Sequence, residues 1–68
     1  MPSTAIRYIT YDSRTSDLRV TFTSGRRYVY AQVPPAIYAA FSHAPSRGAF
    51  FNAHIRDRYD YREEERVG

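Results

Sequence analysis

The sequence has no cysteine, no tryptophan and no lysine, and only three of its 68 residues are glycine. Without cysteine the chain can form no disulfide, no thiolate metal site and no cysteine nucleophile. So few glycines also argue against a glycine-rich phosphate-binding loop. Long hydrophobic runs are missing as well. The longest stretch without a charged residue, 28–46, contains two adjacent prolines and a histidine, which excludes a membrane span.

The length predicts one domain, which we expect over residues 1–62. A domain of this size buries only roughly 60% of the surface that its unfolded chain exposes, so its core is thin. Seven tyrosines and four phenylalanines can compensate, because each large ring buries roughly 150–250 Å². Arg7 interrupts any apolar N-terminal run, so no signal peptide is expected and a cytoplasmic protein is predicted.

The charged residues are unevenly distributed along the chain. Residues 1–59 carry eight arginines against three aspartates, whereas residues 60–68 carry two arginines against four acidic residues. We therefore expect a basic body and an acidic tail, frayed over residues 63–68. All ten basic residues are arginine, whose planar guanidinium group binds phosphate through paired hydrogen bonds and stacks on aromatic rings. Codon bias in the genome is the alternative explanation for the use of arginine and not lysine at every basic position.

The first half of the chain has the pattern of β-strands. Ile6–Asp12 is rich in isoleucine, tyrosine and threonine, and Leu18–Phe22 alternates cleanly between apolar and polar residues. Arg27–Ala31 continues the pattern, with Tyr28 and Tyr30 on one side and Arg27 and Val29 on the other. The polar segment 13–17 and the glycine-containing segment 23–26 consist of residue types that favour turns. Three strands with short links predict an antiparallel β-meander.

The second half has the pattern of two helices. Pro34 and Pro35 suit a first helical turn, and Pro45 ends the first helix. The apolar stripe of that helix consists of Ile37, Ala40, Phe41 and Ala44. Ser46 is expected to cap a second helix, along which Phe51, Ile55 and Tyr59 recur at four-residue spacing. The predicted fold class is α+β, a three-stranded antiparallel β-meander followed by two helices packed on one sheet face.

Catalytic and metal sites are not expected. The two histidines are His43 and His54. Ser42 and His43 are helical neighbours whose side chains point about 100° apart, so they cannot pair directly. His54 and Asp57 could share a helical face, but a triad needs a third group and a metal needs three or four ligands. We therefore predict no enzyme, no metal and no cofactor.

Two sets of residues are candidates for binding nucleic acid. By alternation, one sheet face carries Arg19, Arg27 and Tyr8, with Arg26 in the adjoining turn, which suits phosphate contacts and base stacking. The alternative is an ordinary solvated face. Tyr28 and Tyr30 lie on the other face, where they either belong to the core or stack on a base.

An ordered series of short motifs runs through most of the chain. They are Ile6, Ile9, Tyr11 and Asp12; Leu18–Phe22 and Gly25; Tyr28-Val29-Tyr30; Val33-Pro34 and Tyr38; Ala44–Gly48; Phe51-Asn52; and Ile55 and Tyr59. In this order, over about residues 3–61, the chain resembles the KTSC domain, a family named after the C-terminus of some lysyl-tRNA synthetases. The resemblance implies a small domain, found alone in bacteria and their viruses or appended to a synthetase, for which RNA binding is the usual suggestion.

Three functions are therefore considered. The leading hypothesis is a non-enzymatic module that binds RNA or another single-stranded nucleic acid through arginine and tyrosine. A protein-interaction or self-assembly module is the second, because a meander leaves two strand edges and one open face; a homo-oligomer is expected. A binder of a small nucleotide ligand is the third. Phosphate-driven binding weakens steeply with salt, which distinguishes the first hypothesis from the second.

Overall fold

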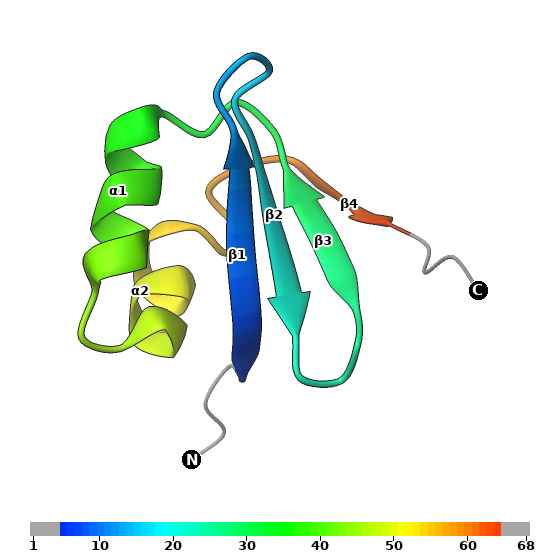
Figure 1. Cartoon of the computed structure of the whole chain (residues 1–68), viewed down its shortest axis with the longest axis vertical. Coiled ribbons are helices and arrows are strands. Elements are labelled where there is room, and N and C mark those ends of the chain that lie inside the picture. The colour runs from blue at the N-terminus through cyan, green and yellow to red at the C-terminus, as the bar shows by residue number, and fades with distance from the viewer. Residues whose placement is uncertain (1–4, 65–68) are drawn as a thin grey trace.

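The computed structural model describes residues 5–64, which form an antiparallel sheet with two helices packed on one face (Figure 1). The sheet has four strands in the order β1-β2-β3-β4, the same as their order in the chain. The helices lie between β3 and β4 in the sequence. The elements are β1 (Ile6–Asp12), β2 (Asp17–Phe22), β3 (Arg27–Tyr30), α1 (Pro35–His43), α2 (Arg47–His54) and β4 (Tyr61–Glu64).

The fourth strand corrects the predicted three-stranded meander. β4 pairs antiparallel with β3, with Tyr30 opposite Tyr61 and Arg27 opposite Glu64. The prediction of a frayed tail is therefore wrong for Glu63 and Glu64, while residues 65–68 lie outside the described residues. Cross-strand pairs stabilise a sheet, and here an aromatic pair and an opposite-charge pair meet along β3. β4 consists of Tyr61 followed by three charged residues, so it lacks the apolar alternation that predicts a strand.

The two predicted turns join the first three strands. In the first, the Ser16 amide donates to the Asp12 carbonyl at 2.8 Å, and Ser16 adopts a left-handed backbone with φ of 63°. In the second, the Gly25 amide donates to the Phe22 carbonyl at 2.9 Å. Gly25 has φ of 94°, a conformation that glycine adopts without a steric penalty. Both hairpins of the predicted meander are thus confirmed.

Both helices begin where proline and serine predicted them to begin. Pro35 begins α1, and the Ser46 hydroxyl accepts a bond from the Ala49 amide at 3.2 Å, which confirms the predicted N-cap of α2. α2 ends at His54, however, so the expected helical position of Tyr59 is wrong. The chain reverses direction at Asp57, which has φ of 65°. Residues 56–58 are charged and exposed, so a longer helix would bury nothing there.

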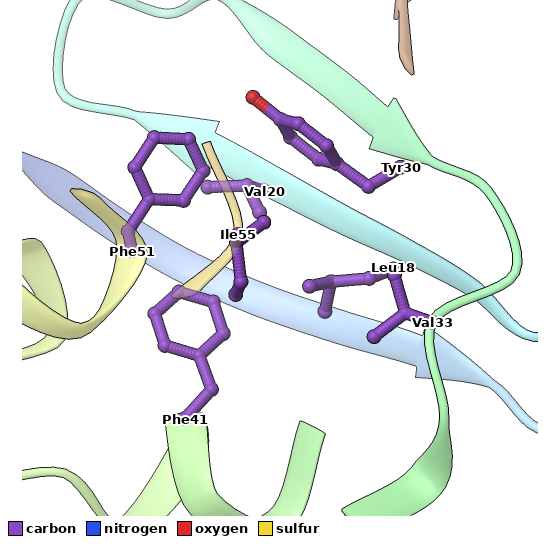
Figure 2. Close-up of a cluster of buried hydrophobic side chains, with 7 residues drawn as sticks. All are labelled: Leu18, Val20, Tyr30, Val33, Phe41, Phe51 and Ile55. Atoms are coloured by element: carbon purple, nitrogen blue, oxygen red, sulfur yellow. The ribbon is translucent and has the colours of Figure 1, made fainter. Parts of the chain in front are cut away.

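The core lies between the sheet and the two helices (Figure 2). It consists of Leu18, Val20, Tyr30, Val33, Phe41, Phe51 and Ile55. From the two predicted apolar stripes, Phe41, Phe51 and Ile55 are buried in this core, and Phe22 of β2 is partly buried against them. Over the described part of the chain, no helix has the length and apolarity needed to cross a membrane.

Candidate nucleic-acid interface

The face of the sheet opposite the helices, here called the open face, carries the predicted arginines. Tyr8, Thr21 and Arg27 lie in one row across β1, β2 and β3, and Thr10, Arg19 and Val29 lie in the next. β4 continues the rows with Glu64 opposite Arg27 and Arg62 opposite Val29. The predicted alternation of residues between the two faces is therefore confirmed.

Glu64 holds both arginines of the open face. Arg19 donates two bonds to the Glu64 carboxylate, Nε to Oε1 at 2.9 Å and Nη2 to Oε2 at 3.1 Å. Arg27 adds a longer contact from Nη1 to Oε1 at 3.5 Å. The bonds from Arg19 are the main reason that the pKa of Glu64 lies below its ordinary value. The positive charge predicted for this face is thus partly neutralised within the protein.

The open face is more filled than a flat platform. Val29 lies on this face between Arg19 and Arg62, yet it is fully buried. Long arginine side chains can cover apolar surface with their methylene groups while their charged ends stay in water, and Arg19 and Arg62 flank Val29 across the sheet. Tyr8 is 49% exposed, so its ring is the large apolar surface that this face offers to a ligand.

A second site, here called the tyrosine pocket, lies on the helix side of the sheet. Tyr28, Tyr30 and Tyr61 contribute to it from β3 and β4, and the Tyr61 ring lies 5.3 Å from each of the other two rings. Tyr30 is 3% exposed and Tyr61 is 59% exposed, so the pocket runs from the core to the surface. Its volume of about 540 Å³ falls in the usual range for small-molecule sites. The full lining is Ala5, Phe22, Thr23, Ser24, Arg26, Tyr28, Tyr30, Phe51, Arg56, Asp57 and Tyr61.

Charged side chains surround the aromatic rings of the tyrosine pocket. Arg26 and Arg56 line it together with Asp57. A hydrogen bond with Tyr28 and the nearby Glu63 carboxylate, 3.8 Å away, raise the pKa of Arg26. Arg56 donates to the Asn52 side-chain oxygen at 3.4 Å. Burial raises the pKa of the Tyr30 hydroxyl above its ordinary value, so this group stays neutral at physiological pH.

The residues considered for catalysis have local structural roles. The Ser42 hydroxyl donates to the Ala39 carbonyl at 2.9 Å, and His43 Nδ1 lies 3.2 Å from the same oxygen. The His54 ring packs against Phe50, with ring centroids 4.6 Å apart. Asp57 lies beyond the end of α2, so the helical face proposed for it and His54 does not form. Within residues 5–64 there is no group of three potential metal ligands.

The six predicted binding residues thus divide between the two sides of the sheet. Arg19, Arg27 and Tyr8 lie on the open face. Arg26 and Tyr28 line the tyrosine pocket, and Tyr30 belongs both to the pocket and to the core. Sequence reasoning missed Tyr61 and Glu64, the β4 residues that complete the two sites. The pairing of Tyr61 with Tyr30 is visible only after β4 is placed beside β3.

Comparisons with known proteins agree on one family. The KTSC domain model matches residues 2–59, ending before β4. A lysine–tRNA ligase of Nostoc punctiforme is 33% identical over 58 residues, which are 85% of this chain but 10% of the ligase. This chain therefore spans only about a tenth of the curated ligases that it matches.

Two smaller relatives match over most of their own length. A protein of Tsukamurella paurometabola is 35% identical over 57 residues, 84% of this chain and 85% of the relative. The crystal structure of a KTSC domain protein from Yersinia pestis superposes with a TM-score of 0.86 at 30% identity, covering 96% of this chain and 92% of that one. The family model, the relatives and the shared fold lead to one conclusion: the chain belongs to the KTSC domain family.

Proposed function

We propose that this domain binds single-stranded nucleic acid, RNA in particular, by seating a base in the tyrosine pocket. The observation that carries the proposal is the placement of three tyrosine rings and two arginines around one cavity. Aromatic rings bind bases by stacking, at about 1–3 kcal/mol per base, and arginines hold the neighbouring phosphates. The pocket offers both kinds of contact within reach of one nucleotide.

The exposure of the three rings gives each a different role in this proposal. Tyr30 is buried and closes the inner end of the pocket. Tyr61 is largely exposed and offers a ring for stacking at the entrance. Arg56 lies beyond the end of α2 and Arg26 lies in the turn before β3, so phosphate contacts can come from two elements.

The relatives add support from their names. Several are called lysine–tRNA ligase, so proteins named for a tRNA contain a segment similar to this domain. Because the segment is only 10% of each ligase, the ligase activity itself is not carried over. A nucleic-acid ligand for the segment agrees with both the names and the pocket.

Two exposed tyrosines on opposite sides of the sheet allow a matched test. A short single-stranded RNA is titrated by fluorescence anisotropy with the wild type, Tyr61→Ala and Tyr8→Ala at several salt concentrations. Tyr61→Ala should weaken binding by about 1–3 kcal/mol with an unchanged salt slope, because stacking and not charge is lost. Tyr8→Ala should bind like the wild type. Loss only in Tyr8→Ala would move the site to the open face, and no binding by the wild type at low salt would refute the proposal.

A small nucleotide is the second ligand that the same cavity fits. Its volume of about 540 Å³ accommodates a nucleoside phosphate, with Tyr61 against the base and Arg26 or Arg56 at the phosphate. Titration with single nucleotides and with oligonucleotides of the same base separates the two ligands. Affinity that rises with oligonucleotide length indicates a strand, and affinity that is already complete with one nucleotide indicates a nucleotide ligand.

Self-association is favoured by a different observation, the free edge of β1. This strand has seven residues and, among the strands of residues 5–64, lies at the edge of the sheet beside β2, so one row of its backbone groups can pair with another strand. A two-fold dimer through antiparallel β1 strands would satisfy those groups. Sedimentation equilibrium tests this: a mass that doubles with rising protein concentration supports the dimer, and a constant monomer mass at high micromolar concentration contradicts it.

A further inference from the structure

The contacts of Glu64 resemble those of a bound anion. Its carboxylate receives two bonds from Arg19 in a fork arrangement and a third contact from Arg27. Arginine forks bind carboxylate and phosphate with the same geometry, because both groups present two oxygens in a plane. The site that holds Glu64 is therefore chemically suited to a phosphate.

The cluster formed by Arg19, Arg27 and Glu64 also contains hydrogen-bond donors that do not bind Glu64. The Arg27 Nε atom is buried and has no hydrogen-bond partner among the described residues, and the same holds for the Thr21 hydroxyl. Thr21 lies directly opposite Arg27 in the β2–β3 register. A carboxylate has two oxygens and a phosphate has more, so a phosphate that replaces Glu64 can accept from more N–H groups of the two guanidinium groups than the carboxylate does.

Glu64 is placed where it can leave this site. It lies in β4, a strand of four residues at the edge of the sheet, and the side chains of Glu64 and its two arginine partners are each about one third exposed or more. Because all three side chains stay partly in contact with solvent, dissolved ions screen the attraction between them. A phosphate arriving from solution can therefore compete with the Glu64 carboxylate without unfolding the sheet.

The anion site and the tyrosine pocket meet at the start of β3. Arg26 and Arg27 are consecutive residues, with Arg26 lining the pocket and Arg27 lying on the open face. A strand whose base occupies the pocket would pass this point on its way around the sheet edge. The phosphate next to the seated base would then come within reach of Arg27.

We propose that Arg19 and Arg27 form a phosphate-binding site that Glu64 occupies in the free protein, so that Glu64 competes with a phosphate of the bound strand. The nature of the ligand rests on the proposed function, but the existence of the anion site does not. β4 thus has two opposite effects on binding, since Tyr61 contributes a ring to the pocket while Glu64 opposes the phosphate.

The first measurement compares Glu64→Gln with Asp60→Asn, which removes the same charge from an exposed residue outside the cluster. Both variants and the wild type are titrated with the short single-stranded RNA at several salt concentrations. Glu64→Gln should bind several-fold more tightly at low salt, with a slope steeper by about 0.7 for the one phosphate that the two arginines gain. Asp60→Asn should show only the small general effect of one charge. Equal affinity and equal slope in the two variants would overturn the proposal.

The second measurement does not depend on RNA. The Nε–H signals of Arg19 and Arg27 are followed by NMR during titration with inorganic phosphate. In Glu64→Gln both signals should shift saturably, at several-fold lower phosphate concentration than in the wild type. Absence of a saturable shift, or the same titration in both proteins, would overturn the anion site. If RNA fails to bind while phosphate behaves as expected, the proposed function is refuted and the anion site stands.

A folding control accompanies both measurements. Circular dichroism checks that Glu64→Gln retains the fold at the temperature of the titrations. If it does not, Glu64→Asp replaces it, because the shorter side chain keeps the charge and withdraws the carboxylate from the arginines. This variant should bind phosphate more tightly than the wild type, and an unchanged phosphate affinity would contradict the proposal.

Discussion

The two sides of the sheet differ in how their side chains are held, although β2, β3 and β4 contribute residues to both sides. On the helix side, Leu18, Val20 and Tyr30 join the core, and the aromatic rings around them line the tyrosine pocket. On the open face, Arg19 and Arg27 form ion pairs with Glu64 above a buried Val29. Burial fixes the side chains on the helix side, whereas the arginines of the open face are held by an ion pair whose anionic partner can be replaced. β4 contributes a residue to each side.

The largest expected effect separates the two sides by stability. Phe51→Ala removes a ring that is 4% exposed from between α2 and the sheet, and should lower the free energy of unfolding by about 3–5 kcal/mol. Tyr8→Ala is the matched aromatic deletion on the open face and should change it by about 0.5 kcal/mol or less. Urea unfolding followed by circular dichroism measures both. Similar losses in the two variants would show that the open face is a second core.

A smaller loss of stability is expected when the N-cap of α2 is removed. Ser46→Ala removes the hydroxyl that accepts the Ala49 amide and should cost about 0.5–2 kcal/mol of stability. Ser42→Ala is the control, because the Ser42 hydroxyl bonds to a carbonyl within its own helix and caps nothing. Thermal unfolding compares the two. A Ser46→Ala variant as stable as Ser42→Ala would show that the cap contributes nothing.

The charge on the pocket side can be tested by salt dependence. Arg56→Gln removes a cation that lines the pocket, and the salt slope of RNA binding should fall by about 0.7, the value for one phosphate of a single strand. Arg14→Gln removes the same charge from the first turn, where Arg14 pairs with Asp12. Its slope should match that of the wild type. The same slope for both variants would mean that general charge, and not the pocket, attracts the strand.

The smallest expected effect concerns acid stability. The pKa of Glu64 is lowered in the folded protein from an ordinary value of 4.5, mainly by bonds from Arg19. The folded state therefore holds the Glu64 proton more weakly than the unfolded state, so its stabilisation is complete above the unfolded pKa and is lost as pH falls through the folded one. Asp12, whose pKa is lowered chiefly by Arg14, contributes in the same direction.

Melting temperatures measured between neutral pH and pH about 3 test this assignment. The wild type should lose stability as pH falls below the ordinary carboxylate pKa. Glu64→Gln should lose less over that range, and the remaining dependence should decrease further in Glu64→Gln combined with Asp12→Asn. An identical acid profile for the wild type and Glu64→Gln would contradict the ion pairs of the open face.

Local patterns in the sequence were sufficient for most of the fold. The alternation in Leu18–Phe22 placed its side chains on the correct faces, and Gly25 marked the turn that follows. Ser46 after Pro45 marked the start of α2. These features depend on neighbouring residues, so their physical causes can be read without knowing what lies elsewhere in the chain.

The binding residues were only partly predictable for the same reason. Alternation showed that Arg19 and Arg27 share a face, and the structure agrees. It could not show that Glu64 pairs with them, since 45 residues separate Glu64 from Arg19. Likewise, Tyr28 and Tyr30 were candidates for stacking, but the sequence could not show that Tyr61 of β4 lines the same pocket.

The sequence by itself thus determined the α+β class, the two hairpins, the helix starts and the aromatic core, because turn chemistry, capping and apolar periodicity act over a few residues. Only the tertiary structure decided that Tyr61–Glu64 forms a strand. That segment has no apolar pattern of its own, and it is held by backbone pairing with β3 and by the side chains it meets there. The identity of both candidate sites depends on this one long-range pairing, which brings Tyr61 to the tyrosines and Glu64 to the arginines.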